Sequence, residues 1–528
     1  MKKILMILFV MMAAAALAFA GGGKDSKAEA TGGNGQTREI TVMVFDRGTD
    51  GGRSDPTNNN WTAWIKEKVL KDENIKVTFI PIPRATRDTA LNNLIAAGTQ
   101  PDVCMTYSSE LIGQYRDLGG VLNLEPYVDT LLVDLKNFLG PDQALPGRDF
   151  IRRMAESDGS LYSLPARRMN TALFGTFIRK DWLDKLGLPL PKTTQQFYEA
   201  MVAFKQRDPG GVGTAKVVPF TLGRNVYWRA GVMLNSFIDP NLSDKELWVN
   251  DVVGRNYLLP GYKEGVRFLN KMYNEGLVDR DFPLYIGDEP SDNLVKTGVV
   301  GAYINNWDQV YRDNPGVWRD LKKNVPTAEL VPCDPFTNSK GITSKGAYDA
   351  AGIFYFVPAA SKEPEAAVRY INWLARFENY NFLQIGPEGI VHDMEDGIPK
   401  LKSAAGLWIQ NGPQNIDYTM HINGLDLKDP ELTAKALANS YTAEPELIVA
   451  AYDMAMKNAK PGVVIPVTLT AAGPYSQTLV DKGDVLMAGA ITAPIANFDR
   501  VWDAGIADWL ASGAQIIRDE RAAKYIAP

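Results

Sequence analysis

Apolar and polar residues follow one another along this chain with two periods, one typical of strands and one typical of helices. Residues 75–79 read Ile-Lys-Val-Thr-Phe, the alternation that is typical of a half-buried strand. Residues 262–273 place apolar side chains three and four positions apart, which predicts an amphipathic helix ending at Gly276. Residues 298–304 form a short apolar run that predicts a buried strand shortly before Trp307.

Strand and helix patterns come in β-α-β-α-β order between residues 40 and 103, and comparable patterns recur at 172–204 and 351–374. Strands separated by helices are typical of α/β lobes whose sheet is largely parallel. The chain of 528 residues is long enough for two or three domains. We therefore expect an α/β protein with mainly parallel sheets flanked by helices.

Several segments together resemble the extracellular solute-binding proteins of ABC sugar importers, and in particular the branch that binds larger oligosaccharides and includes alginate binders. Each segment is weakly specific, but their order along the chain matches that branch. The segments are Gly159–Pro165, Arg179–Leu188, Pro191–Thr193, Tyr262–Phe282, Glu363–Leu374 and Ile385–Pro399.

The resemblance implies a type II periplasmic-binding-protein fold, with two α/β lobes that close over a solute by hinge motion and then meet a membrane permease. We expect the first lobe at residues 38–168 and 350–420, and the second at 169–349 and 421–528. About three crossings would join them: one near Arg167–Asn170, one near Gly346–Gly352 and one after Pro399.

The first residues predict export. Lys2 and Lys3 precede an apolar run and a small-x-small sequence that ends at Ala20, which is the pattern of a cleaved signal peptide over residues 1–20. Residues 21–37 are rich in glycine, lysine and alanine and predict a flexible tether. No cysteine follows the cleavage site, so we expect a periplasmic protein that is not a lipoprotein. An uncleaved signal acting as an anchor is the alternative.

Composition narrows the partners. The net charge is −6 and the pI is near 5.3, which argues against a nucleic-acid partner. The two cysteines, Cys104 and Cys333, could pair, but two buried free thiols are expected. We expect a monomer whose partners are a sugar and an ABC permease.

The chain lacks the common catalytic motifs, including the P-loop, H-E-x-x-H and G-x-S-x-G. Its two histidines, His392 and His421, leave few candidates for a triad, and His392 is expected to pack or hydrogen-bond within a turn. We expect no enzyme activity and no cofactor. A secreted hydrolase or lyase built on paired carboxylates stays open as an alternative, because carboxylate separation is invisible in a sequence.

The loop Asp208–Pro219 resembles the calcium loop of some members of the same branch, but it departs from it. Glycine, valine and lysine stand where those members carry asparagine, aspartate and glutamate. Calcium needs six to eight oxygen ligands, several of them usually carboxylates. We therefore expect the turn without the metal, and no metal site.

Aromatic residues supply the candidates for sugar binding, because a sugar ring offers apolar faces to flat side chains. Trp307 and Tyr107 each follow a strand, where α/β sheets hold ligands. Trp228 follows Arg224-Asn225, and Trp408 precedes Gln410-Asn411, so that each combines a ring with amides. Packing in the core is the alternative for all four.

Arginines raise the question of ligand charge. Arg84 and Arg87 follow a strand, Arg167 and Arg168 lie at the first predicted crossing, and Arg229 follows Trp228. Arginine binds carboxylates in bidentate fashion, which would suit an acidic sugar such as a uronate oligomer. Surface or lobe–lobe salt bridges are the alternative, and a neutral oligosaccharide is the default expectation. A peptide ligand and a signalling role also stay open.

Overall fold

The computed structural model describes residues 35–48, 55–287, 289–313, 315–402, 408, 415–465, 467 and 469–526. The predicted signal peptide and all but the last three residues of the predicted tether lie outside these ranges. Among the residues described, no helix is both long enough and apolar enough to cross a membrane.

The first lobe is built on two small sheets. Strands β1 (Arg38–Asp46) and β2 (Ile75–Pro83) pair in parallel, and Val42 of β1 bridges in parallel to Val103, just before β3 (Cys104–Thr106). A second sheet has the order β13-β4-β10-β3, with β4 at Leu164–Arg168, β10 at Ala351–Phe356 and β13 at Ile422–Asn423. The helices of the first lobe are α3 (Asn60–Glu73), α4 (Arg87–Ala97), α5 (Ser109–Asp117), α6 (Glu125–Val128), α7 (Val133–Leu139), α16 (Pro364–Leu374), α17 (Phe377–Ile385) and α18 (Ile416–Thr419).

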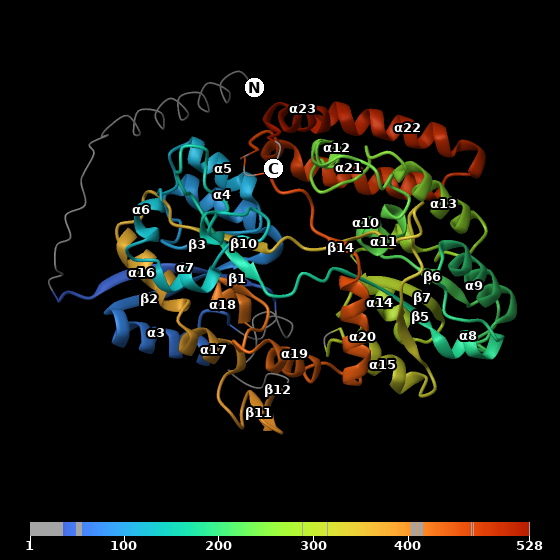
Figure 1. Ribbon diagram of the computed structural model, residues 1–528, viewed down its shortest axis with the longest axis horizontal. Helices are drawn as coiled ribbons and strands as arrows, with labels where there is room; N and C mark the ends of the chain where they lie inside the picture. The colour runs from blue at the N-terminus through green and yellow to red at the C-terminus, as the bar shows by residue number, and fades with distance from the viewer. Residues whose placement is uncertain are drawn as a thin grey trace, which may run out of the picture. The chain divides into compact units, whose positions relative to one another are not determined.

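The helices of the first lobe bury apolar stripes against these strands. Helix α3 packs on β2 and α16 packs on β1 (Figure 1). Trp61 and Trp373, one from each helix, are fully buried in the same apolar core as the strands. Asn59 caps α3 by accepting a hydrogen bond from the backbone N–H of Thr62 at 3.0 Å. The core of this lobe is therefore formed by two segments far apart in the sequence, residues 40–166 and 353–420.

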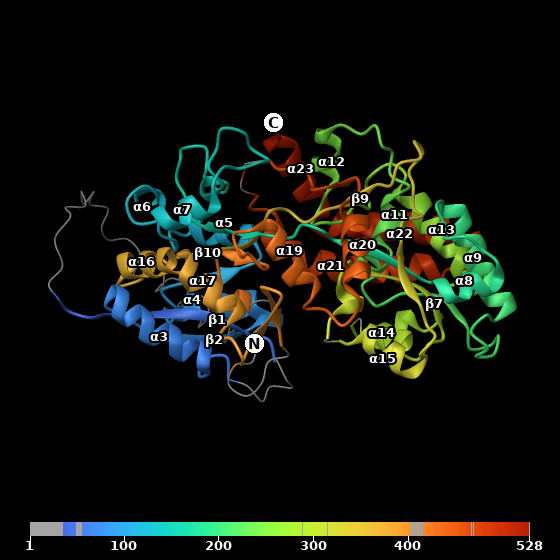
Figure 2. The same ribbon diagram turned by 60° about the horizontal axis from the view of Figure 1, so that its bottom comes forward.

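The second lobe has a four-stranded sheet of order β6-β7-β5-β8, with β5 at Phe174–Arg179, β6 at Val218–Thr221, β7 at Val300–Asn306 and β8 at Leu330–Cys333. Helices α14 and α15 lie side by side beside it (Figure 2). The helices of this lobe are α8 (Lys180–Leu186), α9 (Thr194–Arg207), α10 (Val226–Arg229), α11 (Gly231–Asn235), α12 (Asp244–Asn250), α13 (Tyr262–Asn274), α14 (Glu289–Lys296), α15 (Val317–Asn324), α20 (Pro445–Met456), α21 (Ala472–Thr492), α22 (Phe498–Trp509) and α23 (Gln515–Lys524).

Helix α13 confirms the helical pattern seen in the sequence. Of its predicted apolar stripe, Tyr262, Val266, Leu269 and Met272 are fully buried, and Tyr273 is partly buried. Gly276 has a φ of +70°, the left-handed conformation that ends a helix and that glycine adopts without strain. The apolar run that follows forms β7, which ends at Asn306, one residue before Trp307.

The α/β, two-lobe fold agrees with expectation, but the expectation of mainly parallel sheets was wrong in detail. Strand β10 pairs antiparallel with both β3 and β4, and β5 pairs antiparallel with both β7 and β8. The physical reason is that β5 and β10 enter their sheets through connections between the lobes, not through a right-handed β-α-β crossover. Only a crossover of that kind obliges successive strands to run in parallel.

The connections between the lobes adjoin strands of the β13-β4-β10-β3 sheet. The chain leaves β4 at Arg168 and enters β5 at Phe174, and it returns from β9 (Lys345–Gly346) to β10. Strand β13 pairs in parallel with β4, and the chain then continues through α19 (Pro430–Ala438) to α20. Strand β14 (Ala459–Lys460) pairs in parallel with β9. A hairpin of β11 (His392–Glu395) and β12 (Ile398–Leu401) follows α17.

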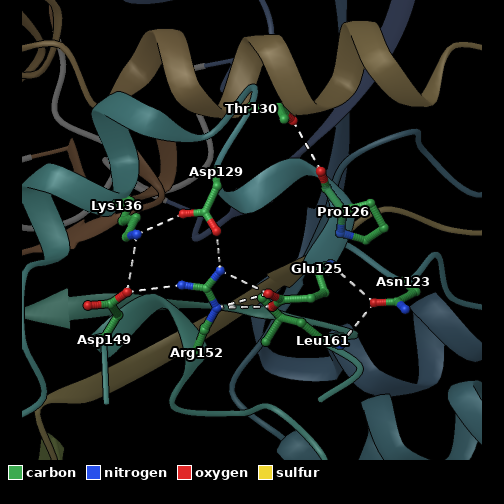
Figure 3. Close-up of polar contacts among 9 residues, drawn as sticks. All are labelled: Asn123, Glu125, Pro126, Asp129, Thr130, Lys136, Asp149, Arg152 and Leu161. Carbon is green, nitrogen blue, oxygen red and sulfur yellow. Dashed lines mark hydrogen bonds and ion pairs between the residues drawn. The ribbon is translucent and has the colours of Figure 1, made fainter. Parts of the chain in front are cut away.

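A charged network fixes the loops around α6 and α7 in the first lobe. Arg152 contacts three carboxylates, Glu125, Asp129 and Asp149, and Lys136 contacts two of them (Figure 3). These residues are partly exposed, so each pair contributes little alone, and the network matters because it joins three segments: α6, α7 and residues 149–152.

Cys104 and Cys333 are both buried and free, as expected. They belong to β3 and β8, in different lobes. Burial raises the pKa of both thiols well above the ordinary value, so neither is a reactive thiolate.

Candidate ligand-binding site

Three strands of the first lobe bring charged and aromatic residues to one edge. Arg47 follows the end of β1, Arg84 follows the end of β2, and Tyr107 follows the end of β3. Because β1 and β2 are parallel and Val103 continues the parallel pairing, these carboxyl ends meet. Open α/β sheets hold their ligands at such an edge.

Tyr107 is the centre of this group. Its ring stacks on Phe45 with centroids 5.7 Å apart. The guanidinium carbons of Arg84 and Arg87 lie 5.2 Å and 4.8 Å from the same ring, within cation–π range. Arg84 Nε donates a long hydrogen bond of 3.4 Å to the Tyr107 hydroxyl. The ring is half-buried, so one aromatic surface with cations around it lies at the strand ends.

Arg47 is anchored by a buried carboxylate. Its Nε and Nη2 donate to the two oxygens of Asp417 at 2.5 Å and 2.8 Å, and Nη2 lies 3.5 Å from the Tyr107 hydroxyl. Burial raises the pKa of Asp417, while the hydrogen bonds and charge of Arg47 oppose that rise. The bidentate geometry orients Arg47 and joins α18 to the end of β1.

Arg168 contributes a cation from the first connection between the lobes. Its guanidinium carbon lies 4.0 Å from the ring centroid of Tyr348, which belongs to the second connection. Arg168 Nε is buried and has no hydrogen-bond partner among the residues described. Burial lowers the pKa of the Arg168 guanidinium, and burial raises the pKa of Tyr348 to about 12.

The second lobe reaches the same group through Trp228. The parallel strands β6 and β7 end at the same edge, and Trp228 in α10 follows β6. The Trp228 ring lies 5.9 Å from that of Tyr348 and packs edge-on against Phe174 at 4.9 Å. The half-buried Trp228 therefore meets Arg168 through Tyr348. Arg168 interacts electrostatically with Tyr107, and this relates the contacts of the second lobe to the group around Tyr107, so that we treat the two groups together as the cluster.

Trp307 follows β7 but is more deeply placed. It is 4% exposed, and Tyr441 and Tyr452 pack edge-on against its ring at 6.0 Å and 5.3 Å. Its neighbour Asp308 accepts hydrogen bonds from Tyr441 at 2.7 Å and from Arg312 at 2.9 Å. Stacking of Trp307 on a ligand stays a prediction, and in this structure other aromatic rings cover it.

Two predicted residues lie apart from the cluster. Arg167 alternates with Arg168 on β4 and so points to the opposite face of the strand. There it donates to the carbonyl of Leu139, and its guanidinium carbon lies 4.5 Å from the Phe150 ring. Trp408 accepts the indole N–H of Trp61 on its carbonyl at 3.1 Å and packs against that ring.

Arg229 serves the core of the second lobe. It is 1% exposed, pairs with Asp292 at 2.9 Å and lies 5.2 Å from the Tyr303 ring.

A separate hollow of about 650 Å³ lies between α9 and the loop that follows it, and none of the predicted ligand residues lines it. Its lining residues are Tyr198, Val202, Lys205, Gln206, Thr214, Ala215, Glu275 and Leu277.

Three residues of the cluster were not named from the sequence: Arg47, Tyr348 and Asp417. Arg47 directly follows a predicted strand and Tyr348 lies in a predicted crossing, so the strand-end rule applied more widely would have found both. Asp417 gives no such signal, because only the folded chain brings α18 to β1 across 370 positions.

The loop after α9 keeps its turn, as predicted. Asp208 has a φ of +41°, and its two carboxylate oxygens accept the backbone N–H groups of Val212 at 3.0 Å and Gly213 at 2.7 Å. The Lys185 ammonium donates to the Pro209 carbonyl at 2.9 Å. The Asp208 carboxylate is therefore engaged by backbone donors, and a cationic side chain lies beside the loop.

Neither histidine belongs to the cluster. His392 is buried in the β11 hairpin, where Nδ1 lies 2.9 Å from the carbonyl of Ile385, in agreement with a structural role. His421 is buried between the rings of Phe138 and Tyr380. Burial lowers the pKa of His421 to about 3, so it is neutral at physiological pH.

The family model for the bacterial extracellular solute-binding protein matches residues 55–379, more than half of the chain. The chain belongs to this family. Lipoprotein LipO of Bacillus subtilis is 25% identical over 355 residues, which span 65% of this chain and 66% of LipO, just under two thirds of that relative. The polygalacturonan/rhamnogalacturonan-binding protein YtcQ of the same organism is 23% identical over 374 residues, which span 66% of this chain and 71% of YtcQ.

Solved structures similar to this solute-binding protein share its fold. The alginate-binding protein AlgQ2, solved without calcium ion, aligns with a TM-score of 0.66 at 19% identity and covers 93% of this chain and 98% of its own. That identity carries the two-lobe fold and leaves the ligand open.

Proposed function

We propose that this solute-binding protein captures an oligosaccharide between its two lobes and delivers it to the permease of an ABC importer. It binds its ligand without turning it over and acts as a monomer. The names of YtcQ and AlgQ2, which include polygalacturonan, rhamnogalacturonan and alginate, support a carbohydrate ligand. Export through a signal peptide at residues 1–20, cleaved to give a periplasmic protein that is not a lipoprotein, belongs to the same proposal.

The observation that carries the proposal is the cluster around Tyr107, Arg168, Tyr348 and Trp228. One group holds Tyr107 with Arg47, Arg84 and Arg87, and a second group holds Arg168, Tyr348 and Trp228. An electrostatic interaction between Arg168 and Tyr107 relates the two groups. Aromatic faces pack on the C–H surface of a sugar ring, and guanidinium N–H groups donate to its hydroxyls. This combination, at the strand ends of both lobes, suits a sugar better than an apolar ligand.

Closure of the lobes over the ligand requires movement about the connections. We assign the first lobe to residues 38–168 with 350–423, because β13 pairs with β4, and the second lobe to residues 169–349 with 424–528. The crossings lie beside Arg168, beside Tyr348 and after β13. Movement there changes the distance between Tyr107 and Trp228, which belong to opposite lobes. A ligand that contacts both favours the closed form by its differential affinity for that form.

The direct test is calorimetric titration of the purified protein with a panel of oligosaccharides, followed by product analysis of the same mixtures. The proposal expects saturable binding of at least one glycan, with a glycan that is recovered intact. Release of shorter products would support the hydrolase or lyase alternative instead. Binding of peptides with no response to any glycan would overturn the sugar assignment.

A further inference from the structure

The cluster carries more positive charge than its carboxylates offset. Four arginines belong to it: Arg47, Arg84 and Arg87 around Tyr107, and Arg168 on Tyr348. Among the residues described, two carboxylates contact these arginines, Asp417 on Arg47 and Asp88 on Arg87. Two guanidinium charges therefore remain unmatched by contact, in a protein whose net charge is −6.

Neighbouring acids do not remove this excess. Asp46, at the end of β1, is exposed and accepts the backbone N–H of Gly48 at 2.9 Å. Asp349, next to Tyr348, forms an ion pair with Arg153 at 3.1 Å, and Arg153 also contacts Asp142. Counting Asp46 in full still leaves the arginines in the majority.

The arginines also present unused donors. Nε of Arg87 and Nε of Arg168 are buried and have no hydrogen-bond partner among the residues described. A buried donor without a partner costs free energy, and a ligand that accepts from it recovers that cost. Arg84 is exposed, and within the described part of the chain its side chain makes one hydrogen bond, a long contact to Tyr107 that leaves most of its N–H groups for another acceptor.

The N-terminus of α4 and the cation–π contacts also favour the binding of an anion. Helix α4 begins at Arg87, directly after Arg84–Thr86, and its N-cap residue Thr86 makes no side-chain capping hydrogen bond. The N-terminus of a helix favours an anion nearby. The cation–π contacts hold the guanidinium groups of Arg84, Arg87 and Arg168 against Tyr107 and Tyr348 before any ligand arrives, which lowers the entropic cost of binding.

We propose that the ligand is an acidic oligosaccharide, whose sugar-ring carboxylates are bound by Arg84, Arg87 and Arg168 while its rings pack on Tyr107 and Trp228. This inference rests on the proposed function and names the class of sugar. A neutral oligosaccharide would leave the unmatched cations desolvated and without a partner anion, whereas a uronate offers each guanidinium a bidentate acceptor.

The test is calorimetric titration with three kinds of tetramer: galacturonate and mannuronate tetramers, the same tetramers with methyl-esterified carboxyl groups, and neutral hexose tetramers. Methyl esterification removes the charge and retains the ring, so it isolates the carboxylate. We expect at least one uronate tetramer to bind at least about tenfold more tightly than its ester. Raising the salt concentration weakens the binding of the acidic ligand and leaves the binding of neutral ligands unchanged.

Variants locate the effect. Arg168→Gln and Arg84→Gln each weaken uronate binding by about ten- to a hundredfold, the range for a lost charge-assisted hydrogen bond, and weaken the binding of neutral sugars by a smaller factor, because a neutral sugar loses only a hydrogen bond to a hydroxyl. Arg500→Gln, on the exposed face of α22, is the matched control and leaves all affinities unchanged. Arg84 is exposed, so its variant keeps the test valid even if the buried Arg168 variant folds poorly.

The two proposals fail in different ways. A neutral tetramer that binds as tightly as every uronate, or uronate binding that survives both arginine variants, overturns the acidic class and leaves the oligosaccharide function standing. A protein that binds no glycan of any charge overturns the oligosaccharide function itself, and the acidic class with it.

Discussion

The guanidinium carbon of Arg168 lies 4.0 Å from the ring centroid of Tyr348, and this contact joins the first connection between the lobes to the second. Both residues adjoin strands of the β13-β4-β10-β3 sheet. Arg168 is the last residue of β4, and Tyr348 lies shortly before β10. Because Tyr348 also meets Trp228, the pair relates both connections to the second lobe. We regard it as the centre of the candidate site.

Arg168 and Tyr348 should be energetically coupled in the folded protein. In a double-mutant cycle with Arg168→Met and Tyr348→Leu, we expect a coupling of about 1–2 kcal/mol in the free energy of unfolding, because both groups are largely desolvated. Urea denaturation measures it. The cation–π pair of Lys271 and Tyr198, at 3.8 Å, has a half-exposed lysine and should couple by about 0.5 kcal/mol. Additive effects of the Arg168 and Tyr348 substitutions would contradict the assignment.

Substitutions of Trp307 test whether this buried ring contacts the ligand. Trp307→Ala removes a side chain that is 4% exposed and should lower stability by about 3–5 kcal/mol, as urea denaturation can determine. Trp307→Phe retains more of the packing, and if Trp307 stacks on the sugar it weakens binding by more than about tenfold. Trp318→Phe, in the same core, is the control for stability alone. Unchanged sugar affinity in Trp307→Phe would limit this residue to packing.

His421 should make stability depend on pH. Its pKa falls from the usual 6.5 to about 3 in the folded protein, so the unfolded chain binds a proton first as the pH decreases. The stability that its neutral form contributes is present above pH 6.5 and is lost as the pH falls from there toward 3. The slope is about 1.4 kcal/mol per pH unit at most, and His421→Phe should abolish it. Parallel wild-type and variant stability curves over this range would refute the burial argument.

Calcium should not stabilise the protein. The Asp208 carboxylate already accepts two backbone N–H groups, and Lys185 donates to the adjacent Pro209 carbonyl. We expect thermal unfolding to be the same in calcium and in a chelator, within about 1 °C, because a metal that binds only the folded state would raise the midpoint. A calcium-dependent rise that Asp208→Asn removes would show that the loop binds the metal after all.

The sequence was sufficient for the elements and for part of the site. Strand ends can be located from apolar runs, which is why Tyr107 and Arg84 were predicted, and the two lie against each other. Trp228 was predicted from its neighbours Arg224 and Asn225. The helix from Tyr262 was predicted because its stripe follows a single period. The antiparallel entry of β5 and β10 was missed, because strand direction depends on connections that cross between lobes and leave no periodic pattern.

The remaining errors come from long-range contacts. Arg167 and Arg168 are adjacent in sequence, yet β4 places them on opposite faces, one against Phe150 and one against Tyr348. The Arg47–Asp417 pair spans 370 positions, and no local pattern can reveal it. Trp408 was a candidate for its neighbouring amides, but its packing on Trp61 depends on how α3 folds.

The central claim is that a ligand contacts residues of both lobes around Arg168 and Tyr348, and hydrogen–deuterium exchange with saturating oligosaccharide tests it most directly. We predict slower exchange in segments 84–90, 105–112, 164–175, 226–234 and 345–352 together, and unchanged exchange in α23, which contributes nothing to the cluster. Protection confined to one lobe, or centred on the hollow beside Tyr198 and Lys205, would contradict the account.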